Sequence, residues 1–205
     1  MEASAKLYIF SIRRNHMTAE ELLGALEVAG KLKDVTRHSW TAKGRHESTA
    51  EHTFRTALFA YFVKDEFPDV DVDRVIKMCL IHDLGEAFTG DIPSFEKTSS
   101  DEEKELDLLA GWVSSLPEPL SSEMRALYTE MASLETDEAK LYKALDNLEA
   151  VVTHNEAPLS TWIGKEYTLN LTYGDDKVAF SPYLIEFRRL LRGISERKIE
   201  NGSGK

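Results

Sequence analysis

A His-Asp pair interrupts an apolar, helix-forming run in the stretch CLIHDLGE, residues 79–86. A lone helical histidine is usually a satisfied core or surface residue. A carboxylate among apolar neighbours is harder to explain, because its burial is costly unless a positive group pairs with it. No lysine or arginine lies three or four residues from Asp83. The stretch therefore predicts a helix whose aspartate, together with His82, binds a cation.

Helical spacing of apolar residues continues on both sides of this stretch and predicts an all-α fold. Capping boxes start helices at Thr18 and Ser48. The second of these helices is expected to turn four large side chains inward: Phe54, Leu58, Tyr61 and Phe62. Further helices are predicted over residues 71–88, 99–113, 121–131, 137–155 and 182–191. Weak strand-like patterns occur at residues 6–11 and 167–172, and residues 37–47 form a polar stretch.

Composition limits the classes to which the protein can belong. Its 205 residues predict one domain, residues 1–200, followed by a disordered tail at residues 201–205. The formal net charge of −11 argues against broad nucleic-acid binding. No apolar run approaches the roughly 18 residues of a membrane helix, and the single cysteine, Cys79, excludes an internal disulfide. We therefore predict a cytoplasmic protein that binds neither a membrane nor nucleic acid.

Two further residues are candidate ligands of the predicted cation. His52 stands early in its helix, and Asp146 is flanked by leucines of another helix. Asp146 also has an equally good interpretation as a surface residue paired with Lys143. Two histidines and two aspartates would form a mixed nitrogen and oxygen set, which suits Mn²⁺, Co²⁺, Fe²⁺, Ni²⁺ or Zn²⁺ better than Ca²⁺.

Two acidic residues that follow the His-Asp pair are candidates for proton transfer. Glu86 lies three residues after Asp83, on the same helix face, and Asp91 follows Gly90 in a predicted loop. Acidic residues that lie near a metal without binding it can transfer protons. The alternative for each is a solvated surface acid, which is the usual environment of these side chains.

The ordered set of His52, the His82-Asp83 pair and Asp146 resembles the H…HD…D signature of the HD-domain superfamily. Flanking segments resemble its 5′-deoxynucleotidase branch: ESTAEH at 47–52, HDLGE followed by TGDIP at 82–93, and KALD at 143–146. RHSW at 37–40 resembles an R-x-x-W element that precedes the first histidine in some members. The resemblance covers residues 18–162 of the chain.

This resemblance implies a single-domain helical fold, one divalent metal, hydrolysis of nucleoside 5′-monophosphates, notably 5′-deoxynucleotides, and a homodimer. The implied metal ligands are His52, His82, Asp83 and Asp146. Glu86 would be the acid and base near the leaving oxygen, and Asp91 would position water or the sugar. Arg37 would contact the phosphate and Trp40 would shape the sugar or base site. Lys143 would contact the phosphate or support the metal site.

Two other functions stay open at this point. One is a different HD-type activity, such as hydrolysis of a deoxynucleoside triphosphate, a cyclic nucleotide, an alarmone or another phosphate ester. The other is a catalytically silent helical binding protein that keeps its metal for structure, and the presence of Glu86 and Asp91 argues against it. The sequence alone leaves open the preferred base, discrimination at the 2′-position and the resident metal.

Overall fold

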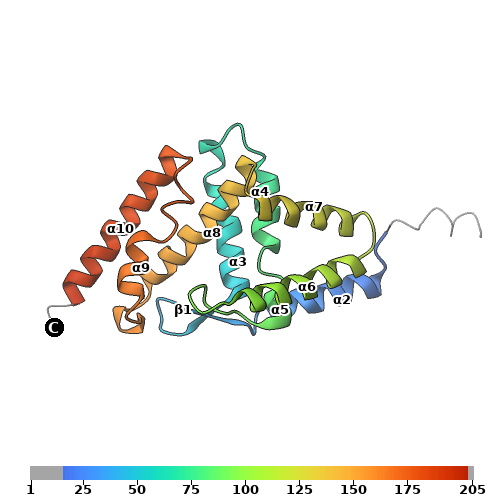
Figure 1. Ribbon diagram of the computed structural model, residues 1–205, viewed down its shortest axis with the longest axis horizontal. Helices are drawn as coiled ribbons and strands as arrows, with labels where there is room; N and C mark the ends of the chain where they lie inside the picture. Colours follow the sequence, from blue (N-terminus) through green and yellow to red (C-terminus); the bar gives the residue numbers. More distant parts are fainter. Residues whose placement is uncertain (1–15, 203–205) are drawn as a thin grey trace, which may run out of the picture.

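The computed structural model describes residues 16–202, and most of them lie in helices (Figure 1). In chain order the elements are α2 (Ala19–Lys31), β1 (Thr36–Trp40), β2 (His46–Ser48), α3 (Thr49–Phe62), η1 (Lys64–Glu66), α4 (Val72–Ile81), α5 (Glu86–Thr89), α6 (Ser99–Ser115), α7 (Leu120–Ser133), α8 (Asp137–Glu156), η2 (Leu159–Thr161), α9 (Glu166–Thr172) and α10 (Pro182–Gly202). The predicted all-α fold is confirmed, with one small hairpin in the stretch predicted as polar and irregular.

Helices α3, α4 and α8 pack against one another at the centre of the molecule, with α9 and α10 at one end and α2, α6 and α7 at the other (Figure 1). Helix α8 is central because its apolar residues recur at helical spacing: Leu141, Leu145 and Leu148 are fully buried. They share a core with Val75 and Met78 of α4. This packing fixes the relative positions of the three segments that carry the candidate ligands.

Local capping signals in the sequence are confirmed. Thr18 and Glu21 exchange side-chain and backbone hydrogen bonds at the start of α2, and Ser48 and Glu51 do the same at the start of α3. The Ser181 hydroxyl accepts a hydrogen bond from the backbone N–H of Leu184 at 3.3 Å, where α10 begins. These bonds satisfy N–H groups that have no partner within the helix.

The predicted inward face of α3 is wrong. Phe54, Tyr61 and Phe62 are 63%, 53% and 73% exposed, and Leu58 is only partly buried. Phe54 and Tyr61 lie about 180–200° around the helix from His52, so both cannot share its side. The buried face instead carries small or polar residues: Thr49, His52, Thr53, Thr56, Ala57 and Ala60. Small side chains let α4 and α8 approach α3 closely, and the apolar face is left outward.

The helix predicted over residues 71–88 is interrupted at the His-Asp pair. Helix α4 ends at Ile81, and a tight turn leads into the short helix α5. Within this turn the N–H of Leu84 donates to the carbonyl of Ile81 at 3.1 Å, a three-residue spacing tighter than that of an α-helix. Gly90 ends α5 with φ +80°, a conformation that favours glycine. The chain then turns towards Asp91.

The strand-like pattern at residues 167–172 is a helix in the structure, which corrects the prediction. Arg188 of α10 is 2% exposed and donates to the carbonyls of Asn170 at 3.0 Å and Tyr173 at 2.9 Å. These carbonyls lie at the end of α9, where a helix has no partners of its own. A tertiary contact therefore stabilises α9 against its local sequence preference.

The predictions for the two chain ends can be compared with the structure only in part. Helix α10 extends to Gly202, so the first two residues of the predicted tail are helical, while 203–205 lie outside the described residues. The strand-like pattern at 6–11 also lies outside them. Within residues 16–202, none of the helices combines the length and apolar character that crossing a membrane requires.

Candidate active site

Four side chains bring nitrogen and oxygen atoms close together: His52 of α3, His82 and Asp83 of the turn after α4, and Asp146 of α8. Nε2 of His52 lies 3.2 Å from Nε2 of His82 and 3.1 Å from Oδ1 of Asp146. Nε2 of His82 lies 3.1 Å from Oδ2 of Asp83. Atoms that share one ion at bonds of about 2.0–2.2 Å are themselves about 3–3.5 Å apart. His52, His82 and Asp83 are thus close enough together to share a single cation, and Asp146 lies beside both histidines, 3.1 Å and 3.6 Å from their Nε2 atoms.

Hydrogen bonds orient both histidines towards this point. Nδ1 of His52 donates to Glu149, and Nδ1 of His82 donates to the carbonyl of Cys79 at 2.7 Å. A histidine whose Nδ1 carries the proton presents the lone pair of Nε2. Burial opposes charge on His82, but the neighbouring aspartates raise its pKa to about 10. The set therefore attracts positive charge, and its nitrogen and oxygen donors fit a divalent transition metal.

A buried network behind His52 was not anticipated from the sequence. Glu149 is 1% exposed and also accepts hydrogen bonds from Arg55 and from the Thr153 hydroxyl. Burial alone would raise the pKa of Glu149, but the hydrogen bond from His52 and the charge of Arg55 hold it below its usual value. The spacing in the sequence could have indicated this network. Glu149 follows Asp146 by three residues and Arg55 follows His52 by three, so each lies on the same helix face as a candidate ligand.

We expect Glu149→Gln to weaken metal binding by about 10–100-fold, because the amide no longer increases the basicity of the His52 imidazole. Competition titration with a chromophoric Zn²⁺ chelator measures the affinity. Glu156→Gln is the matched control: Glu156 pairs with the same Arg55 but is half exposed, and among residues 16–202 it forms no ion pair with His52. Equal affinities in the wild type and Glu149→Gln would contradict the positioning role.

Two basic side chains flank the ligand set. Arg37 of β1 lies 3.3 Å from Oδ2 of Asp83 and 3.6 Å from Glu47, and Lys143 lies 2.7 Å from Oδ2 of Asp146. Burial opposes the charge of Arg37, but the carboxylates, Asp83 foremost, raise its pKa above the ordinary value. Asp83 has no basic residue three or four positions away in the sequence, and Arg37 of the distant strand β1 provides its positive partner instead.

Glu86, at the start of α5, is suited to hold a proton. It is 6% exposed, and the Thr49 hydroxyl donates to its Oε2 at 2.7 Å. Burial, followed by the charges of Asp83 and Asp91, raises the pKa of Glu86 to about 9. A carboxyl group with so high a pKa is protonated near neutral pH and can serve as an acid.

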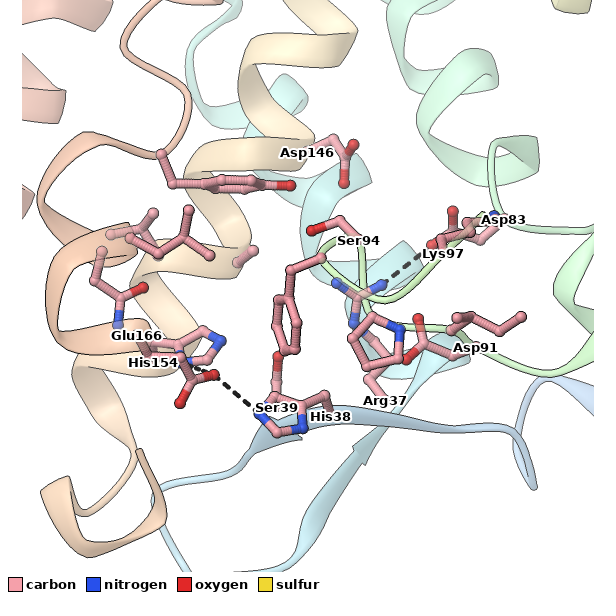
Figure 2. Close-up of a pocket in the computed structure, with 18 of the residues that line it drawn as sticks. Arg37, His38, Ser39, Asp83, Asp91, Ser94, Lys97, Asp146, His154 and Glu166 are labelled. Carbon is pink, nitrogen blue, oxygen red and sulfur yellow. Dashed lines mark hydrogen bonds and ion pairs between the residues drawn. The ribbon is translucent and has the colours of Figure 1, made fainter. Parts of the chain in front are cut away.

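A cavity of about 300 Å³ opens over these groups. One side is lined by Arg37, Asp83, Glu86, Asp91, Lys143 and Asp146. In Figure 2, Asp83 and Asp91 lie on the side opposite His154 and Glu166. The cavity volume lies at the lower end of the range of small-molecule sites, about 300–1,000 Å³. The fold therefore brings the predicted metal, acid-base and phosphate-contact residues to one small-molecule site.

Trp40 is the exception among the predicted site residues. In the part of the chain that the structure describes, it does not line this cavity. Its ring lies 4.0 Å from that of His46 across the hairpin. Trp40 follows Arg37 by three strand positions, about 10 Å along the strand, so the two side chains do not reach the same point.

These features define a class: a helical protein in which histidines and carboxylates that could hold a metal ion, a buried acid and basic side chains surround a small-molecule cavity. A family model described as HD domain matches residues 29–185, and the chain belongs to the HD-domain family. The resemblance inferred from the sequence is thereby confirmed.

Relatives and solved structures agree with this assignment. Human 5′-deoxynucleotidase HDDC2 is 32% identical over 142 residues, covering 67% of this chain and 69% of the relative. The crystal structure of a predicted metal-dependent phosphohydrolase from Magnetospirillum magnetotacticum is 26% identical, with a TM-score of 0.72 over 89% of this chain and 94% of that chain. Cyanophage S-2L HD phosphohydrolase DatZ shares the fold at 20% identity, with a TM-score of 0.55 over 85% of this chain and 96% of its own.

Proposed function

We propose that the protein is a metal-dependent phosphohydrolase that removes phosphate from deoxynucleoside 5′-monophosphates. One observation carries the proposal: His52, His82, Asp83 and Asp146 lie close together beside Arg37, Lys143 and the buried Glu86, at a cavity of small-molecule size. The relationship to human 5′-deoxynucleotidase HDDC2 supports the choice of substrate.

The chemistry follows from the position of each group. His52, His82, Asp83 and Asp146 would hold a divalent cation, which would supply Lewis-acid chemistry at the phosphoryl group and help to activate the attacking water. Arg37 is placed to neutralise non-bridging oxygens through paired N–H groups. As water attacks phosphorus and the bond to the 5′-oxygen breaks, Glu86 donates its proton to that oxygen. Asp91 positions water or the sugar, and Lys143 holds Asp146 at 2.7 Å.

The metal is proposed to be Mn²⁺, Co²⁺, Fe²⁺, Ni²⁺ or Zn²⁺, because mixed imidazole and carboxylate ligands suit these ions. The homodimer and the cytoplasmic location stay predictions. The outward apolar face of α3, which includes Phe54, Tyr61 and Phe62, is a surface that a second copy could cover. The mass of the protein in solution checks the dimer.

The direct test is phosphate release from ribo- and deoxyribonucleoside 5′-monophosphates after the protein is stripped and reloaded with one metal at a time. We expect metal-dependent release that is faster for deoxynucleotides and absent in His82→Ala. The ratio of the rates for deoxyribonucleotides and ribonucleotides tests whether the protein has the specificity of the 5′-deoxynucleotidase branch. Bound metal without release from any substrate, including triphosphates and simple phosphate esters, would overturn the proposal and favour the silent binding protein.

A further inference from the structure

The cavity has a second group of polar side chains that the phosphate chemistry does not use. Oε1 of Glu166, on α9, lies 3.0 Å from Nε2 of His38 and 3.3 Å from Nδ1 of His154 (Figure 2). Glu166 is 2% exposed, and its Oε2 accepts the N–H of Ile163 at 2.7 Å. The carboxylate therefore lies beside two imidazoles, one from β1 and one from α8, on the side of the cavity away from Asp83 (Figure 2).

Asn170, one helical turn after Glu166, offers an unused donor at the same side. It lines the cavity and is 3% exposed. Within residues 16–202, its side-chain Nδ2 has no hydrogen-bond partner. An unpaired donor in a buried position is costly, so its presence beside a cavity points to a partner that the ligand supplies. Helix α9 cannot easily turn Asn170 away, because Arg188 fixes the Asn170 carbonyl.

Apolar surface completes this part of the cavity. The ring of Phe95 packs edge-on against His38 at 5.6 Å, with the Lys165 ammonium 5.3 Å from its centre. Leu169 and Val151 also line the cavity. Flat apolar walls with a few polar groups at the edge suit a planar heterocycle, which proteins read by stacking and by hydrogen bonds to the ring edge.

We propose that Asn170 and Phe95 form the subsite for the nucleobase, with Glu166 as a positioning residue that holds His38 beside Phe95. Asn170 Nδ2 donates to an acceptor on the edge of the base, and Phe95 covers its face. The assignment rests on the proposed function, because it takes the phosphate to lie at Arg37 and the metal ligands. The subsite adds the contacts by which the protein would distinguish a nucleotide from a sugar phosphate without a base.

The test compares deoxynucleoside 5′-monophosphates with 2-deoxyribose 5-phosphate, which lacks the base. Asn170→Leu keeps the side-chain size and removes the donor. We expect its kcat/KM to fall about tenfold for the nucleotides, mainly through KM, because one hydrogen bond is lost. For 2-deoxyribose 5-phosphate the value should match that of the wild type. Phe95→Ala, in the partly buried loop between α5 and α6 and outside the hydrophobic core, should show the same selective loss.

Thr168→Ala is the matched control, since Thr168 lies on the same helix, is exposed and does not line the cavity. Calorimetric binding of deoxyadenosine and thymidine gives a second readout that needs no hydrolysis, and it should weaken in Asn170→Leu and Phe95→Ala. Release from no substrate, with nucleoside binding that both variants weaken, would refute the proposed reaction and support the subsite. Equal losses for nucleotides and 2-deoxyribose 5-phosphate, or nucleoside binding that neither variant changes, would overturn the subsite.

Discussion

Asp83→Ala is expected to lose both the bound cation and catalysis. Asp83 is one of the four proposed metal ligands and also pairs with Arg37 at 3.3 Å. Its loss leaves two histidines and one carboxylate for the metal, and it frees the guanidinium that should bind phosphate. A metal ion contributes several kcal/mol to the transition state, so turnover should fall by about 10³-fold or more.

Metal per chain, measured by mass spectrometry of the purified protein, and phosphate release together check this prediction. Asp107→Ala is a suitable control, because Asp107 is an exposed aspartate of α6. It should keep full metal content and full activity. Turnover in an Asp83→Ala protein that contains no metal would refute the proposed mechanism.

Glu86→Gln is expected to keep the metal and to lower kcat by about 10²–10⁴-fold, the usual contribution of general acid-base catalysis. Glutamine preserves the size of the side chain and can still accept the hydrogen bond from Thr49. Glu86 itself is not among the four ligand residues, so metal content should equal that of the wild type. Glu102→Gln is the control, since Glu102 also lines the cavity but is exposed.

The dependence of activity on pH gives a second test of the role of Glu86. With its pKa raised to about 9 by burial and by Asp83, Glu86 holds its proton below that pH and loses it above. Activity that needs the proton should fall as pH rises through the pKa, and a bound cation moves this alkaline limb to lower pH. Glu86→Gln should lack the limb. Loss of the metal in this variant, or an unchanged kcat, would show that the assigned role is wrong.

The sequence by itself predicted the helical class, most helix positions and the four residues that meet as candidate ligands. Helix α8 shows why: Leu141, Leu145 and Leu148 recur at helical spacing, and all three are fully buried. Caps at Thr18 and Ser48 are equally local, since each joins residues three apart. The His-Asp pair was recognisable because a buried carboxylate without a nearby basic residue is an electrostatic anomaly.

Predictions made from the local sequence pattern were wrong in two helices, because tertiary packing outweighed the local preference. In α3 the large apolar residues are outward, because His52 and the small residues beside it face α4 and α8. In α9 a strand-like sequence is helical, because the buried Arg188 binds its terminal carbonyls. Local preferences are weak compared with such contacts, so they decide structure only where packing leaves the choice open.

Only the tertiary structure decided which distant residues complete the site. Arg37 reaches Asp83 across 46 positions, and His52 reaches Glu149 across 97. The meeting of His38, His154 and Glu166 likewise depends on three separate elements. The sequence by itself determined the helices, because helix formation depends on the spacing of residues close together in the chain. The long-range contacts depend on how the helices pack against one another, and no local pattern in the sequence shows that packing.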